Sequence, residues 1–257
     1  MSIHSQIIDP QSIDPASRAA LVDALFALNC DVFGGVERAA FERYLIPSAA
    51  IRVRIQVLHD DGLLAGYAVA QIYEHEDAED RPLVFRTIVA LRPAYRRRSL
   101  CSMFLAREGL CVRVAYPMRR LYGFACPVNP ASYQVLARYT TELWPSPERE
   151  TPPEIEALMG ALATHFHLEE EADAPGVCHV GWCTRQQADE AQAWTTTQNA
   201  AARFYLERNP RYAEGYGLLV LVPMRLTMLA GALAKLAMKR LRVRRTAPLA
   251  TRARVAS

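Results

Sequence analysis

The feature that most constrains the fold is a buried strand followed by an arginine-rich turn and a helix. Residues 83–91 form an apolar, β-branched run that is typical of a buried strand. The segment RPAYRRRSLCS follows over 92–102, and helical spacing of apolar residues continues over 102–114. A strand over 121–125 and a helix over 129–141 complete the unit. This order of elements predicts a mixed α/β fold.

The arginine-rich turn predicts an anion site at the start of the helix. The first backbone N–H groups of a helix lack partners, and that end carries partial positive charge. Arg96, Arg97 and Arg98 lie in the turn, and Arg92 lies nearby. We expect the turn to bind a pyrophosphate or a phosphopantetheine. Arginines that only solubilise the surface are the alternative.

The segment IVALRPAYRRRSLC over 88–101 resembles the cofactor-binding strand and loop of the GNAT acyltransferase superfamily. In that family the strand leads into V-x-P-x-x-R and then (Q/R)-x-x-G-x-(G/A) at a helix start. Arg96 matches the first position of this loop. Ser99 stands where the family has glycine, and Cys101 where it has glycine or alanine. Downstream, Asn129 in NPASY resembles the asparagine that opens the last helix of the family core.

The resemblance implies an α/β fold over residues 1–150, with a mixed, splayed β-sheet flanked by helices. It also implies an acyl donor, either acyl-CoA or the acyl-phosphopantetheine of a carrier protein, whose pantetheine arm lies where the strands separate. The acyl group passes to an amine acceptor, while a backbone N–H polarises the thioester carbonyl. The donor contacts that it implies are Leu91, Arg96, Arg97, Arg98, Ser99, Leu100, Cys101 and Asn129.

The acid–base residues follow less directly from the motif. The family's leaving-group tyrosine corresponds to Leu136, so Tyr133 and Tyr139 are the candidates to protonate the thiolate. Packing of their rings is the alternative. Glu74 and the adjacent His75, at the end of a predicted strand, are the candidates for the general base. A solvated charged loop is the alternative there.

The N-terminal part is predicted to supply helices and a β-hairpin. Residues 16–46 have helical spacing, interrupted by the glycine pair at 34–35. Residues 51–57 alternate strictly between apolar and polar, which is typical of a half-buried strand. The turn signal DDG over 60–62 leads to a partner strand over 63–73.

Residues 151–223 are predicted to form a helical or mixed extension or cap over the α/β unit. Helices are expected over 152–164 and 186–208, with a strand over 176–184 between them. The segment 212–223 carries glycine and an apolar run. The role of this extension stays open at the level of sequence.

Residues 224–257 are predicted to form a basic amphipathic helix and a polar tail. Wound as a helix, 225–242 has leucines on one side and basic residues on the other. We expect residues 224–245 to contact an anionic membrane surface. Docking of the helix on the protein's own core is the alternative. The charges argue against a membrane span. The leucines are Leu226, Leu229, Leu233 and Leu236, opposite Lys235, Lys239 and Arg242.

The remaining composition excludes several function classes. The six cysteines show no CxxC pair, which predicts reduced thiols in a cytoplasmic protein. If residues 224–245 contact lipid, we expect the protein at the inner face of the membrane. The residues between His165 and Cys183 lack the paired spacing of a zinc site, so no metal is expected. Cys101 beside arginines suggests a covalent route, although simple packing is favoured. No nucleic-acid motif is present.

Two functions from different classes remain open. The first is an N-acyltransferase, with an acyl chain that is longer than acetyl if the apolar, basic C-terminal segment works near a membrane. The second is a non-catalytic GNAT-like module that binds an acyl cofactor or docks on a membrane. Ser99 and Leu136, which depart from the family pattern, motivate this second hypothesis.

Overall fold

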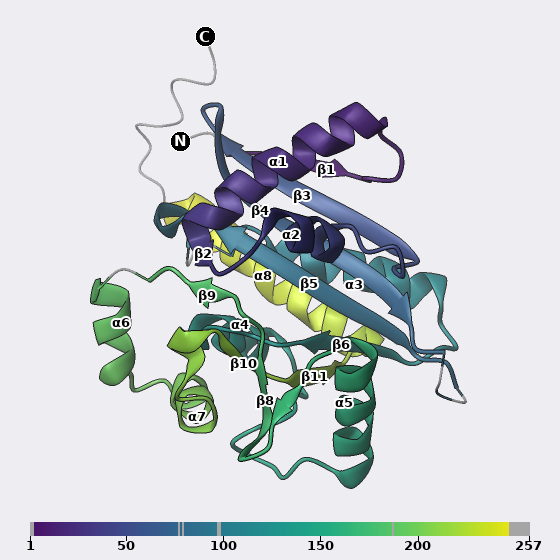
Figure 1. Cartoon of the computed structure of the whole chain (residues 1–257), viewed down its shortest axis with the longest axis vertical. Helices are drawn as coiled ribbons and strands as arrows, with labels where there is room; N and C mark the ends of the chain where they lie inside the picture. The colour runs from purple at the N-terminus through teal and green to yellow at the C-terminus, as the bar shows by residue number, and fades with distance from the viewer. Residues whose placement is uncertain (1–2, 77, 79, 97–98, 187, 247–257) are drawn as a thin grey trace.

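A six-stranded sheet forms the centre of the protein (Figure 1). The computed structural model describes residues 3–76, 78, 80–96, 99–186 and 188–246 of the 257 residues. Neighbouring strands are antiparallel except for β5 and β6, which are parallel. The predicted mixed α/β fold is therefore confirmed. In spatial order the strands are β1 (Ile3–Ile8), β3 (Arg52–Asp60), β4 (Leu63–Glu74), β5 (Leu83–Leu91), β6 (Leu121–Ala125) and β11 (Val220–Pro223).

The predicted hairpin is formed by β3 and β4. Its two-residue turn has Asp61 at φ 49° and Gly62 at φ 84°. Positive φ at both positions is the conformation that Asp-Gly adopts most readily and that matches the twist of a hairpin. The sheet also has an edge strand that was not predicted, β1, which pairs with β3.

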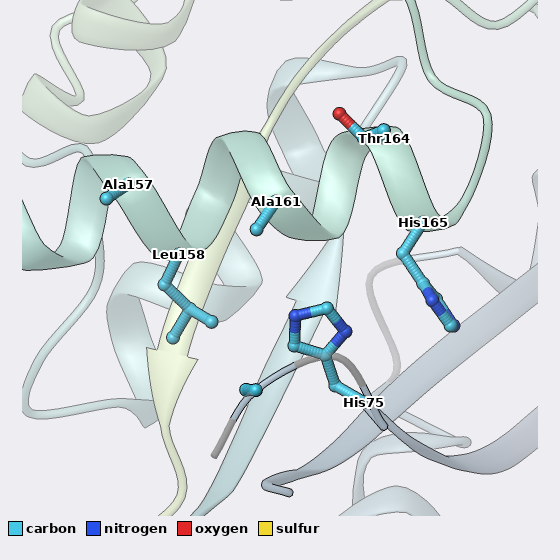
Figure 2. A pocket seen from close by; sticks show the side chains of 7 residues that line it. His75, Ala157, Leu158, Ala161, Thr164 and His165 are labelled. Atoms are coloured by element: carbon cyan, nitrogen blue, oxygen red, sulfur yellow. The ribbon is translucent and has the colours of Figure 1, made fainter. Parts of the chain in front are cut away.

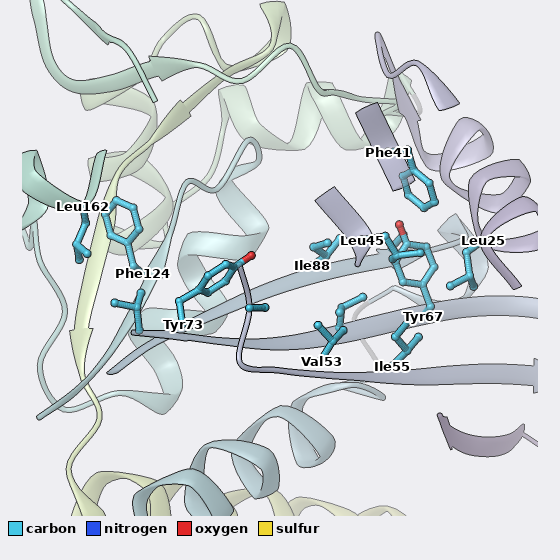
Figure 3. Packing of buried hydrophobic residues seen from close by; sticks show 14 of the residues in the cluster. Leu25, Phe41, Leu45, Val53, Ile55, Tyr67, Tyr73, Ile88, Phe124 and Leu162 are labelled. Carbon is cyan, nitrogen blue, oxygen red and sulfur yellow. The ribbon is translucent and has the colours of Figure 1, made fainter. Parts of the chain in front are cut away.

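One face of the sheet is covered by three helices. These are α1 (Pro15–Val32), α2 (Arg38–Leu45) and α5 (Pro153–His165). Asp14 caps α1 by accepting a hydrogen bond from Ser17 N at 3.0 Å. Burial of their apolar sides against the sheet is the main stabilising contribution on this face. The core here includes Leu25, Phe41, Leu45, Val53, Ile55, Tyr67, Ile88, Phe124 and Leu162 (Figure 3).

The opposite face carries α3 (Ser102–Ala115), α4 (Pro130–Tyr139), α7 (Ala200–Arg208) and α8 (Leu226–Thr246). The ribbon of α8 runs beside α3 beneath the sheet (Figure 1). At Gly109 of α3 a Cβ atom would lie 2.6 Å from Met224 and 3.1 Å from Leu229, so glycine permits this close packing.

The apolar side of α8 faces the protein's own core. Leu229 and Leu236 are buried and Leu233 is half-buried, whereas Leu226 is exposed. The membrane-surface prediction required this stripe to be free, so the structure favours the docking alternative. Within the described ranges, no helix combines the length and the apolarity that a membrane span requires. The tail 247–257 lies outside the described residues.

The chain leaves the main sheet near Trp144 and returns to it near Leu221. Trp144 N donates to Leu221 O at 2.9 Å, and Leu221 N donates to Trp144 O at 2.8 Å. Residues 145–219 are thus inserted between two neighbouring extended segments. Because β11 follows the insertion, residues 1–150 alone do not complete the sheet.

The described part of the insertion holds α5, α7, one further α-helix, four strands and a short 3-10 helix (Tyr212–Glu214). Three of its strands form a small sheet in the order β10 (Tyr216–Leu218), β8 (Ala174–His179) and β7 (Glu170–Glu171). The fourth, β9 (Cys183–Thr184), pairs separately with β2 (Phe33–Gly34). The prediction of a single helix over 186–208 is wrong. This segment forms two helices, α6 (Ala188–Thr195) and α7, because the side chain of Asn199 starts a new helix by accepting a hydrogen bond from Ala202 N at 3.0 Å.

Candidate functional site

A gap opens where β5 and β6 part. Their parallel pairing comprises only Leu83–Leu121, Val84–Tyr122 and Phe85–Gly123, and it ends there although β5 continues to Leu91. On its other side β5 stays paired with β4 as far as Leu91. Within the described strands, nothing pairs with residues 86–91 on the side away from β4. The splayed sheet that the resemblance implied is therefore present.

The backbone of β5 offers hydrogen-bonding groups to this gap. Arg92 N donates to Ala65 O on the β4 side, and Leu83 N donates to Arg120 O on the β6 side. Because peptide groups alternate along an antiparallel strand, those of Thr87 and Val89 face the gap. Such groups stabilise an extended, amide-containing chain laid alongside them.

The turn after β5 has the strained backbone that glycine would relieve. Ser99 has φ 54°, in the left-handed region that residues other than glycine seldom adopt. The prediction that this position corresponds to a glycine thus has a backbone reason. Ser99 Oγ accepts a hydrogen bond from Lys239 Nζ of α8 at 2.7 Å. Lys239 therefore brings positive charge to the start of α3, which is the positive end of that helix dipole.

The arginines of the turn are engaged by carboxylates. Arg96 Nη1 lies 2.6 Å from Glu190 Oε2 of α6, and its Nε donates to Leu91 O at 3.3 Å. Arg92 pairs with Asp31 of α1 at 2.6 Å. Arg97 and Arg98 lie outside the described residues. The partner of Arg96 is thus a carboxylate of the insertion.

The start of α3 is closed by apolar packing. Cys101 is buried, and its burial raises the pKa of the thiol to about 12. The burial of the thiol agrees with simple packing, which the sequence favoured over a covalent acyl-cysteine route. Leu91 and Leu100 are half-buried against the same cluster. The N-cap residue of α3, Cys101, makes no side-chain cap hydrogen bond.

The last helix of the unit begins where the sequence predicted. Asn129 caps α4 by accepting a hydrogen bond from Ala131 N at 2.8 Å. Tyr133 is fully buried, its hydroxyl donates to Pro145 O at 2.8 Å, and burial raises its pKa. Tyr139 is half-buried at the C-terminal end of α4. The hydroxyl of Tyr133 is thus engaged inside the core.

The base candidates lie at the other end of β5, away from the arginine-rich turn. Glu74 is opposite Leu83 and makes ion pairs of 2.9 Å with both Arg81 and Arg119. His75 is buried beneath α5, where it contacts the ring of His165 (Figure 2). The two imidazoles line a hollow of about 500 Å³ together with Ala78 and with side chains of α5. The structure does not bring Glu74 and the turn together.

Sequence reasoning missed three residues near the gap. Glu190 and Lys239 reach the turn from α6 and α8, and neither contact has a local sequence signal. Arg86 lies on β5 where the gap begins, and its position inside an apolar run was the only available hint. Elsewhere in the described part of the chain, no three His, Cys, Asp or Glu side chains gather as metal ligands would.

Comparisons with known proteins find similarity at the level of fold. The sequence matches no family model and no curated protein sequence. Arabidopsis thaliana NAA60 with acetyl-CoA is 15% identical, with a TM-score of 0.38 over 55% of this chain and 87% of NAA60. A GNAT-family acetyltransferase from Streptococcus pneumoniae is 14% identical, with a TM-score of 0.35 over 58% of this chain and 94% of that one.

An acyl-CoA N-acyltransferase from Pseudomonas aeruginosa is 14% identical, with a TM-score of 0.35 over 54% of this chain and 87% of its own. The similarity covers little more than half of the chain, and the insertion and α8 add further elements.

Proposed function

We propose that this protein is an acyltransferase that moves an acyl group from a phosphopantetheine thioester to an amine. The main observation in support of this proposal is the gap between β5 and β6, which the backbone of Thr87 and Val89 faces. The pantetheine arm is an extended chain with two amides, so it suits a strand with free peptide groups. The gap narrows at Phe85 and Gly123, where the thioester carbonyl would lie.

The anionic end of the donor is proposed to lie at the turn before α3. Three features support this position: the uncapped start of α3, the side chain of Arg96, and Lys239 at the end of α8. Each is a source of positive potential, and a helix start alone stabilises an anion by about 0.3–1 kcal/mol. Donor binding then requires Arg96 to exchange Glu190 for a phosphate.

The protein's own residues act mainly by positioning. A backbone N–H of β5 polarises the carbonyl, so the amine attacks a fixed, desolvated thioester. We propose Tyr139 as the proton donor to the leaving thiolate, because the hydroxyl of Tyr133 donates to Pro145. The Tyr139→Phe variant is then expected to lower kcat while leaving donor affinity unchanged.

Donor binding is tested by replacing one backbone donor. Val89→Pro removes the N–H that faces the gap, and it leaves the ladder with β4 intact because that N–H does not point to β4. We expect about tenfold weaker binding of CoA and acyl-CoA, on the scale of one hydrogen bond in a desolvated site. Val89→Ala keeps the N–H and is the matched control.

A thermal-shift series with CoA and with acyl-CoAs of increasing chain length gives the first readout. Radiolabelled transfer to an amine panel gives the second. Binding without transfer to any amine would favour the non-catalytic module. Equal binding by the Val89→Pro and Val89→Ala variants would refute the proposed donor position.

A further inference from the structure

One buried cation on the main sheet lacks an acidic partner. Arg86 is 7% exposed, and within the part of the chain that the structure describes no carboxylate forms an ion pair with it. The other buried charged groups on the sheet and on α3 are held. Glu108 pairs with Arg52 at 3.0 Å, and Asp60 accepts from the Tyr95 hydroxyl at 3.0 Å. A buried, unpaired charge is costly, so Arg86 requires an explanation.

The described residues around Arg86 accept few hydrogen bonds from it. Its guanidinium lies 4.2 Å from the centre of the Phe166 ring and 5.5 Å from that of Tyr44. Its one hydrogen bond to a described residue runs from Nη2 to the Tyr44 hydroxyl at 3.4 Å, which is long. A guanidinium has five N–H donors in a planar fork. Stacking on aromatic rings orients this fork without satisfying it.

Arg86 stands at the point where the two strands part. It is the first residue of β5 beyond the last pair with β6, Phe85–Gly123. Its side chain contacts α2 at Tyr44 and the residue after α5, Phe166, so it lies on the α1–α2–α5 face. Helix α3, whose start is proposed to hold the anionic end of the donor, packs on the opposite face. An acceptor that meets the thioester from the side opposite the donor therefore approaches Arg86.

The charge of Arg86 also reaches the end of β6. The pKa of the Cys126 thiol is raised by a hydrogen bond with Cys178 and by burial, while Arg86 acts in the opposite direction. Cys126 follows β6 directly, and Cys178 belongs to β8 of the insertion. Arg86 is thus close to the insertion as well as to both strands that border the gap.

We propose that Arg86 binds the carboxylate of the acceptor, and that the acceptor is an amine that carries a carboxylate, as an amino acid does. This inference rests on the proposed function. A planar guanidinium with free donors matches a carboxylate in a two-pronged geometry, and one cation matches one monoanion. The amine of an amino acid lies close to its carboxylate, which places the nucleophile at the narrow end of the gap.

The test uses acceptors that differ only in this charge. Amino acids and their amides are assayed in matched pairs with one acyl-CoA. The wild-type protein is expected to prefer the acid. Arg86→Met is expected to lower kcat/KM for the acid about 10- to 100-fold, the scale of hydrogen bonds to a charged group, and to leave the amide unchanged. Arg86→Lys, which keeps the charge without the fork, should retain part of the preference.

A stability measurement separates recognition from a structural role. Met fits between the rings of Tyr44 and Phe166 without an unpaired charge, so Arg86→Met is expected to unfold at the same denaturant concentration as the wild type or a higher one. A purely structural Arg86 predicts easier unfolding, and equal loss of kcat/KM for the acid and the amide. That result overturns the inference.

Binding distinguishes failure of the inference from failure of the proposed function. With CoA present, an amino acid is expected to raise the melting temperature of the wild type and not of Arg86→Met. Transfer to acids and amides at equal rates would overturn the role of Arg86 and leave the acyltransferase intact. Absence of a CoA-induced shift, with no transfer to any amine, would overturn both.

Discussion

Arg96 and Glu190 form an ion pair of 2.6 Å although 94 positions separate them in the sequence. Both side chains are largely shielded, with exposed fractions of 18% and 19%. The pair joins the turn before α3 to α6, a helix of which no residue is buried. A carboxylate of α6 therefore holds the arginine that is proposed to bind the donor's phosphate.

Neutralising this carboxylate is expected to strengthen donor binding. In the Glu190→Gln variant Arg96 no longer exchanges one anion for another, so CoA should bind about fivefold more tightly, the equivalent of about 1 kcal/mol. Titration calorimetry measures the affinity. Asp189→Asn, an exposed residue of the same helix, makes the same change in net charge. Equal gains in both variants would indicate a general charge effect and contradict a specific role for Glu190.

The backbone at Ser99 makes a prediction about glycine. At φ 54° the Ser99→Gly variant relieves a left-handed conformation that costs about 1 kcal/mol for a residue with a Cβ. The free energy of unfolding should stay within about 0.5 kcal/mol of the wild type, because glycine also loosens the unfolded chain. Ala106→Gly inside α3 should cost about 1 kcal/mol. Urea unfolding compares the two. Because Ser99→Gly also removes the hydrogen bond from Lys239 Nζ to Ser99 Oγ, an equal loss would mean that the relief of strain does not offset the loss of this contact.

Burial of Cys101 predicts a stability change at alkaline pH. The folded thiol has its pKa raised from 9.0 to about 12, so the folded state keeps the proton while the unfolded chain releases it. This contribution is fully present below about pH 9 and is lost as the pH rises toward 12. Cys101→Ala should therefore show a smaller loss of stability between pH 9 and 11. Identical pH profiles would show that the thiol titrates normally.

The docking of α8 predicts which of its apolar side chains stabilise the protein. Leu229 is 2% exposed, so Leu229→Ala should cost about 2–5 kcal/mol of unfolding free energy. Met238 is 52% exposed, and Met238→Ala should cost less than about 0.5 kcal/mol. Chemical denaturation measures both. A small effect at Leu229 would mean that α8 does not rest stably on α3.

The sequence alone identifies the elements that have a strong local pattern. The alternation over 51–57 and the turn at 60–62 specify the hairpin, and Asn129 specifies the start of α4. These signals are local because hydrogen bonds within a turn or a helix cap involve neighbours in the chain. The apolar run over 83–91 likewise indicates a strand that is buried on both faces.

Elements defined by distant contacts were not predictable in the same way. The strand β1 has mostly exposed side chains, so its sequence lacks the alternation of a half-buried strand. The two helices over 188–208 merge in a periodicity analysis, because the break at Asn199 depends on a cap and not on proline or glycine. Amphipathicity shows that α8 has an apolar side, but it does not say whether lipid or α3 covers that side.

The residues of the candidate site also divide into those with a local sequence signal and those defined by distant contacts. The turn and its strand are contiguous in sequence, so Arg96 and Ser99 could be identified from a motif. Glu190, Lys239 and Arg86 acquire their roles from elements that meet only in the folded chain. Pairing of a charge with a partner 94 positions away leaves no local trace in the sequence.

The paired backbones of Trp144 and Leu221 give the insertion a property of its own. Its two ends lie side by side, so a segment of almost any length between them closes without stretching the sheet, at an entropic cost that grows only slowly with length. Such a segment can be replaced as a unit. The strand, turn and helix over 83–115 are held by the rest of the sheet, whereas the insertion supplies α6, which pairs with the turn, and α5, which covers the face that also carries α1 and α2. Natural or designed replacement of residues 145–219 would then change what approaches the gap while preserving the groove along β5.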